Sequence, residues 1–70
     1  MHQSQLSLLE YFEYGHLPEG PMRDTSAECC VLANKMAASL ELSSAGAELT
    51  TGLRKLLEAK DCFVRAAKNL

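Results

Sequence analysis

Two residues in one stretch of the chain have side chains suited to binding a flat, anionic ligand. Tyr14 lies between a short and a long helical segment, and its ring would either stack on a base or cover the end of a helical core. His16 would either donate a hydrogen bond to a phosphate or remain in solvent. Neither residue by itself decides between a ligand site and a structural role.

A second group of candidate residues lies in the last third of the chain. Arg54 and Lys55 are adjacent cations, and Thr50 and Thr51 place hydroxyl groups about one helical turn earlier. Such a group can hold a phosphate by charge-assisted hydrogen bonds. The alternative interpretation is a solvated helix face without a ligand.

Lys60 interrupts an otherwise apolar stripe, because it lies seven residues after Leu53 and seven residues before Ala67. Its methylene groups would lie on the apolar surface with the ammonium group in water. Alternatively, the ammonium group would make a polar contact that sets the register of two helices. The third interpretation is a contact to a ligand phosphate.

Known catalytic and metal-binding patterns do not occur in the sequence. There is no G-x-S-x-G, no H-E-x-x-H and no glycine-rich phosphate loop, so we expect neither an enzyme nor a cofactor. Adjacent helical residues point about 100° apart and no C-x₂-C spacing occurs, so no metal site is expected from His16, Cys29, Cys30 and Cys62. The odd number of cysteines favours reduced thiols in an intracellular protein.

The charges are unevenly distributed along a chain of 70 residues with a formal net charge of −2. Residues 1–43 contain two basic and six acidic residues, whereas residues 44–70 contain five basic and three acidic residues. The last helix can therefore attract a small anion, while the rest of the chain repels a DNA or RNA polymer. No apolar run is long enough to span a membrane and the N-terminus lacks a signal-peptide pattern, so the expected location is the cytoplasm.

The candidate residues must be positioned by helices, because the apolar spacing and the Gly and Pro breaks favour an all-α fold. A short helix is predicted over residues 4–12, where Ser7 and Glu10 have the spacing of a capping box. A loop is predicted over 14–21, and long helices over 22–42 and 47–69, the second with Ser44 as its N-cap. The expected organisation is an N-terminal arm and loop (1–21) and a two-helix antiparallel hairpin (22–70).

Each long helix carries a line of apolar residues at helical spacing. In the last helix the line consists of Leu49, Leu53, Leu56, Leu57, Phe63, Val64 and Ala67. In the helix before it the line consists of Cys29, Leu32, Met36 and Leu40, flanked by Ala33 and Ala37. Two helices alone make a poor core, and chains of about 70 residues rarely stabilise themselves without further support. We therefore expect a homo-oligomer in which copies bury the apolar stripe against one another.

Residues 11–18 (YFEYGHLP), 48–61 (ELTTGLRKLLEAKD) and 64–67 (VRAA) are the most distinctive segments of the chain. With these segments, residues 11–68 resemble the helical-hairpin family of phage anti-CBASS and anti-Thoeris proteins. Members of that family are sponges, typically hexamers, that bind cyclic dinucleotides, cyclic trinucleotides or cyclic ADP-ribose isomers without cleaving them. The resemblance implies that this chain sequesters such an immune signal in the cytoplasm of the bacterial host and so blocks anti-phage defence.

The resemblance also implies roles for individual residues. Tyr14 matches the tyrosine that stacks on a base in the family. A basic residue that meets phosphate in the family corresponds here to Ser26 or Ala27, with Arg23 about one turn earlier as a substitute. An arginine that members binding cyclic trinucleotides use is replaced here by Ala47. A ligand of dinucleotide size is therefore expected.

Two other functions remain open from the sequence. A helical hairpin that oligomerises and binds a protein partner would explain the apolar stripe and Lys60, but it would leave the Tyr14 loop unexplained. A small DNA-binding regulator would have to overcome the net negative charge and the missing recognition helix. Binding of a cyclic dinucleotide would separate the first of these from the sponge.

Overall fold

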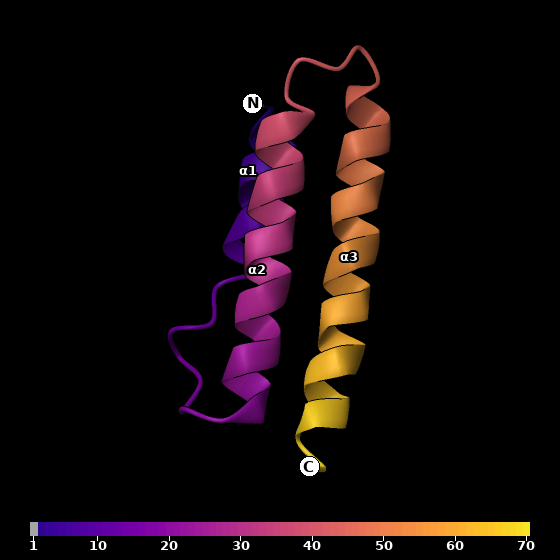
Figure 1. The fold of residues 1–70 in the computed structure, drawn as a ribbon. Coiled ribbons are helices and arrows are strands. Elements are labelled where there is room, and N and C mark those ends of the chain that lie inside the picture. Colours follow the sequence, from indigo (N-terminus) through magenta and orange to yellow (C-terminus); the bar gives the residue numbers. More distant parts are fainter. Residues whose placement is uncertain (1) are drawn as a thin grey trace.

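The computed structural model describes residues 2–70, and this part of the chain contains three α-helices and no strand. The helices are α1 (Gln3–Glu10), α2 (Pro21–Ser39) and α3 (Gly46–Ala67). The two long helices lie side by side and run in opposite directions, and α1 packs against both of them (Figure 1). The molecule is a rod of 40 × 18 × 17 Å. The all-α class expected from the sequence is confirmed.

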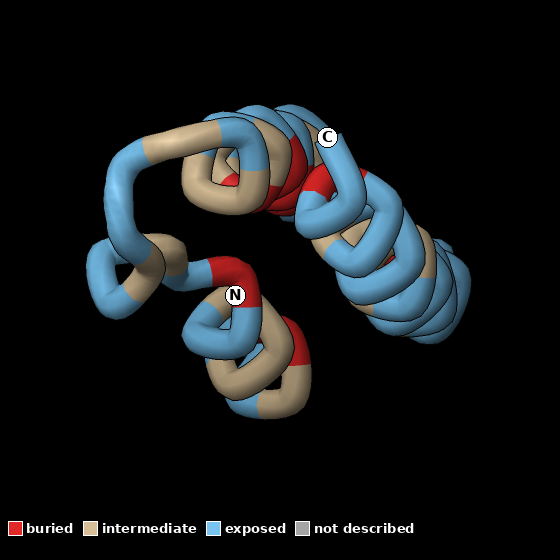
Figure 2. Tube along the Cα trace, turned by 90° about the horizontal axis from the view of Figure 1, so that it is seen from below, coloured by how far each residue is buried: buried red, intermediate tan, exposed pale blue. Residues whose placement is uncertain are grey.

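The core lies where the three helices face one another (Figure 2). Phe12, just after α1, is fully buried and is clustered with Cys29, Ala33, Ala37, Leu49 and Leu53. Leu8 and Leu9 of α1 pack against the same cluster. The expectation that the apolar stripe has little to pack against within one chain is therefore wrong for Leu49 and Leu53. The reason is that α1 and Phe12 complete a core that two helices alone would leave open.

Small residues form most of the buried side of α2. Its buried positions are Ser26, Cys29, Ala33 and Ala37, whereas Leu32 and Leu40 remain almost half exposed. Small side chains allow the helices to approach closely, so the alanines lie at the contact with the rest of the core. The predicted apolar line of this helix is therefore wrong for Leu32 and Leu40, which lie to one side of the buried stripe.

The N-terminal cap of α1 differs from the predicted one. His2 is the N-cap, and its Nδ1 accepts a hydrogen bond of 3.1 Å from the backbone N–H of Ser4. The Gln5 side chain accepts in return from the backbone N–H of His2, at 3.3 Å. The capping box therefore joins residues 2 and 5, and the predicted box at Ser7 and Glu10 is wrong. Histidine is outside the usual set of N-cap residues, so the residue types alone do not indicate this cap.

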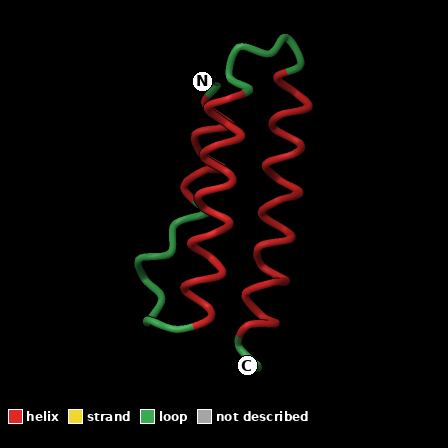
Figure 3. The backbone as a smooth tube through the Cα atoms, in the orientation of Figure 1, coloured by secondary structure: helices red, strands yellow, loops and turns green. Residues whose placement is uncertain are grey.

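The loops of the molecule determine where the long helices begin and end (Figure 3). Gly20 has a φ of 139°, a conformation that residues with a side chain rarely adopt, and Pro21 follows at the first helical position. The helix that was predicted to continue to residue 42 ends at Ser39. The predicted N-cap Ser44 is also wrong, because α3 is preceded by Ala45, whose backbone N–H donates to Ser43 Oγ at 3.0 Å.

Two side chains attach α1 to α3, one near each end of the short helix. Gln5 is buried, and its Nε2 donates to the Gly46 carbonyl and to Thr50 Oγ1, both at 3.2 Å. Lys60 Nζ donates at 3.0 Å to the carbonyl oxygen of Tyr11, the C-cap of α1. An eight-residue helix would not be stable alone in water, so these contacts and its apolar side hold it in place.

Candidate functional site

The first group of candidate residues lies in the loop between α1 and α2. Tyr14 is half-buried, and its carbonyl oxygen accepts a turn hydrogen bond of 3.0 Å from the Leu17 N–H. The guanidinium carbon of Arg23, in the first turn of α2, lies 5.8 Å from the centroid of the Tyr14 ring. This distance is typical of a cation–π contact. The loop therefore presents a flat aromatic surface and a permanent positive charge together.

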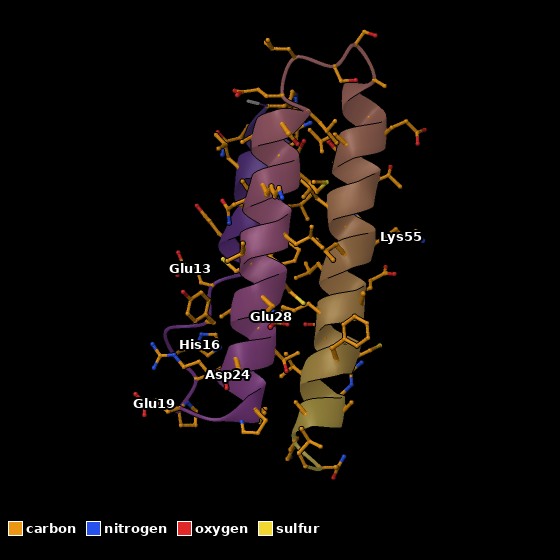
Figure 4. The ribbon with its side chains drawn as sticks, in the orientation of Figure 1. Glu13, His16, Glu19, Asp24, Glu28 and Lys55 are labelled. Atoms are coloured by element: carbon orange, nitrogen blue, oxygen red, sulfur yellow. The ribbon has the colours of Figure 1, made fainter. Side chains whose placement is uncertain are left out.

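Carboxylate groups lie on the same side of the molecule as this loop and affect what it can bind. His16 is exposed, and Glu13, Glu19 and Asp24 lie on the same side of the molecule near it (Figure 4). Their negative charges oppose the approach of an anionic ligand. Arg23 alone therefore makes a weak phosphate site at this end of one chain.

The second group lies near the N-terminal end of α3, beside the start of α1. Thr50, Thr51 and Arg54 line a pocket of about 480 Å³ together with His2 and Gln5. Thr50 Oγ1 already donates to the Gly46 carbonyl at 3.1 Å and accepts from Gln5, so its hydroxyl serves the fold. The polar groups of this pocket that remain available include the exposed Thr51 hydroxyl and the exposed Arg54 guanidinium group.

Lys55 and Ser26 lie apart from these two groups. Lys55 is exposed on the side of α3 that points away from α2 (Figure 4). Ser26 is only 1% exposed, and its Oγ has no hydrogen-bond partner among the described residues. A ligand outside the chain does not reach this hydroxyl in the conformation seen here.

The two groups of candidate residues lie on different segments: the first is in the loop between α1 and α2, and the second is on α3 beside the start of α1. Thr25, close to Arg23 in α2, shares a groove with Ala66 near the end of α3. Ala66 follows Arg54 by twelve residues, which corresponds to about 18 Å along a helix. The start of α2, which carries Arg23, therefore lies far from Arg54 along the rod.

An apolar surface runs along the junction of α2 and α3. Two adjoining grooves of about 420 and 460 Å³ share Leu32 and Leu56, and no residue of α1 lines either of them. We call this surface the apolar face; its large side chains are Leu32, Met36, Leu40, Leu56, Phe63 and Leu70. The core residues Leu49 and Leu53 also line the first groove but are buried. The Phe63 side chain is 57% exposed. Sequence reasoning placed Phe63 on the stripe but did not separate the part that one chain buries from the part left open.

Gln5 and the partner of Lys60 were missed from the sequence. Gln5 stands at the capping-box distance from His2, and this spacing was the available signal for its buried position. The partner of Lys60 is a backbone carbonyl 49 residues away, which no side-chain pattern encodes. The interpretation of Lys60 as a polar contact between helices describes the observed bond, in which the acceptor is the backbone carbonyl of Tyr11. Asp61, its neighbour in sequence, is 3.5 Å from Nζ.

The cysteine thiols and carboxylates were considered as titrating groups and as metal ligands. Burial raises the pKa of the Cys29 thiol above its ordinary value, and the Glu28 carboxylate adds to this while the Lys60 ammonium group opposes it. Within residues 2–70, no three His, Cys, Asp or Glu side chains lie close enough to hold a metal ion. None of the described helices combines the length and apolar character needed to cross a membrane.

The chain was compared with family models, curated proteins and solved structures. No family model, curated protein or solved structure matches the chain.

Proposed function

We propose that this protein sequesters cyclic nucleotide immune signals, cyclic dinucleotides above all, without cleaving them, and so blocks bacterial anti-phage signalling. The observation that carries the proposal is the contact between Tyr14 and Arg23. Arg23 lies over the Tyr14 ring, so a base would stack on the opposite face of the ring while the guanidinium group pairs with the adjacent phosphate. The resemblance of residues 11–18 and 48–61 to the sponge family supports the same ligand class.

The proposed protein is a homo-oligomer of helical hairpins, a hexamer by resemblance to the family. The surface area of one chain supports association. One copy exposes 4860 Å², whereas a compact monomer of 7.7 kDa exposes about 4,300 Å². Part of the excess is apolar, because Phe63 and Leu70 of the apolar face are mostly exposed. Covering this face with further copies would remove it from water.

Association also explains how the two separated groups act on one ligand. Tyr14, His16 and Arg23 of one copy would supply the stacking surface and a first cation. Arg54 of a second copy would supply the positive charge that the carboxylates near the loop oppose, and the Thr51 hydroxyl beside it would add a hydrogen bond. Symmetry then repeats every contact for the second base and the second phosphate of a cyclic dinucleotide.

The proposed protein binds a small cyclic nucleotide and has no polymer partner and no enzymatic activity. A cyclic oligonucleotide or a cyclic ADP-ribose type of signal is the ligand, in the cytoplasm of the bacterial host. A net charge of −2 and the carboxylates near Tyr14 disfavour a DNA or RNA polymer. The protein needs no catalytic group, no cofactor and no membrane, because sequestration depends only on copy number and affinity.

Native mass spectrometry of the purified protein with a panel of cyclic nucleotides tests this proposal. We expect an oligomer that gains intact ligand masses, most strongly with cyclic dinucleotides. Recovery of uncleaved ligand after heat denaturation would agree with sequestration. An oligomer that binds no member of the panel would contradict the sponge.

The alternative is an oligomeric adaptor that binds a protein partner through the apolar face. The open Phe63 and the partly open Leu32 and Leu40 favour it, since exposed apolar surface of this kind often marks a protein contact. This function would leave the contact between Tyr14 and Arg23 without a role. The same mass spectrometry distinguishes the two functions, because an adaptor gains no nucleotide mass.

A further inference from the structure

Lys60 links the middle of α3 to the beginning of the Tyr14 loop. Its side chain is 13% exposed, and its Nζ donates at 3.0 Å to the carbonyl oxygen of Tyr11. Tyr11 is the C-cap of α1, where backbone carbonyls lack helical partners and the helix dipole is negative. An ammonium group at this position both satisfies a carbonyl and interacts favourably with the dipole.

The segment between the Tyr11 carbonyl and Tyr14 is short and fixed in position. Only residues 12 and 13 separate Tyr11 from Tyr14, and Phe12 is fully buried. The backbone N–H groups of Phe12 and Glu13 still donate to the last turn of α1, at 3.1 and 3.3 Å. The position of the Tyr11 carbonyl therefore determines where the Tyr14 turn starts. Arg23 holds the ring from the other side of the loop, on α2.

We propose that Lys60 is the positioning residue for Tyr14. Its ammonium group fixes the C-terminal end of α1 to α3, and the loop then presents the Tyr14 ring in one place, ready for stacking. Lys60 does not touch the ligand in this proposal. The consequence for ligand affinity rests on the proposed function, whereas the effect on the Tyr14 ring does not.

The test compares Lys60→Met with Lys68→Met, which removes the same charge from an exposed site at the end of α3. Ring resonances of Tyr14, assigned with Tyr11→Phe, report its surroundings by NMR, and titration with cyclic di-GMP reports affinity. We expect Lys60→Met to shift and broaden the Tyr14 resonances. Binding should weaken by up to about tenfold, because a charged hydrogen bond of this strength can hold the loop in its binding conformation by about that factor. Lys68→Met should change neither, and Lys60→Arg, which keeps a cationic donor, should restore both.

Unchanged Tyr14 resonances in Lys60→Met would overturn the proposal. If the resonances move but the unmodified protein binds no cyclic dinucleotide, the positioning role stands and the proposed function fails. If the unmodified protein binds and Lys60→Met binds equally well, the positioning role fails and the sponge stands. Should Lys60→Met not fold, amine labelling of the unmodified protein decides instead: Lys60 should react more slowly than Lys68, and equal rates would overturn the proposal.

Discussion

Tyr14 is placed by the loop and by Arg23 so that its ring is half-buried and close to a cation. We expect Tyr14→Ala to lose the stacking of one base, which costs about 1–3 kcal/mol. Tyr14→Phe keeps the ring and should retain most of the affinity. Isothermal titration with cyclic dinucleotides measures both variants. Equal affinity of Tyr14→Ala and the unmodified protein would remove Tyr14 from the site.

The Cys29 thiol should make the stability of the fold depend on pH, because burial raises its pKa above the ordinary value of 9.0. Above that value the thiol of the unfolded chain loses its proton, while the folded chain keeps it. The folded state then binds more protons, so the free energy of unfolding must fall as the pH rises. Below the ordinary value both states keep the proton, and the contribution is fully present.

Urea denaturation between about pH 8 and pH 10 measures this effect. The control is Cys29→Ala, which removes the titrating group, so the difference in slope between the two proteins isolates the thiol from lysine and tyrosine titration. We expect the unmodified protein to lose stability more steeply. Parallel curves would show that the Cys29 thiol titrates alike in the folded and unfolded chains.

At the scale of elements, α1 is the part of the fold that the sequence analysis described least completely. The long helices follow from Pro21 and from apolar residues three and four apart, and these signals are local. The docking of α1 depends on Gln5 and Lys60, whose partners are more than 40 residues away in sequence. Local patterns contain no information about such pairs, so the closing of the core by Phe12 was missed as well.

The same limit applies to the candidate site. Tyr14 and Arg23 lie nine residues apart across one loop, and the structure brings them together. Arg54 and Tyr14 were both assigned to the ligand site, and the structure places them on different segments, Arg54 on α3 and Tyr14 in the loop before α2. Ser26 was assigned by motif alignment, and its burial depends on how α2 is rotated against its neighbours. Rotation of a helix with many small residues is difficult to infer from periodicity, because alanine and leucine both count as apolar.

Gln5→Ala tests the attachment of α1. The substitution removes two hydrogen bonds donated by Gln5 Nε2 and leaves the Gly46 carbonyl and the Thr50 hydroxyl bonded only to each other. At about 0.5–1.5 kcal/mol for each bond, we expect a loss of about 1–3 kcal/mol in the free energy of unfolding. Gln3→Ala, on the exposed side of the same helix, should change stability by much less. Thermal and urea denaturation followed by circular dichroism measure both variants. If the two substitutions have equal effects, the Gln5 contacts do not hold α1 in place.

At the scale of the whole molecule, substitutions in the core of one chain and substitutions on the apolar face should have different effects: the first on folding, the second on association. Leu53 is 2% exposed and belongs to the cluster around Phe12, so a charge at this position should unfold the chain itself. Phe63 lies on the same stripe but is 57% exposed. A charge at Phe63 can therefore act on association while leaving the fold of one copy intact.

We expect Phe63→Glu to dissociate the oligomer while the helical circular dichroism is retained. Leu42→Glu is the matched control, because Leu42 is equally apolar and 99% exposed but lies outside the grooves of the apolar face. Sedimentation velocity should show a single copy for Phe63→Glu and the full assembly for Leu42→Glu. Because the proposed site draws Tyr14 and Arg54 from different copies, Phe63→Glu should also lose binding of cyclic dinucleotides although it changes no ligand-binding residue. If Phe63→Glu dissociates but still binds with full affinity, the whole ligand site lies within one chain. If Phe63→Glu remains assembled, the interface between copies does not involve the apolar face.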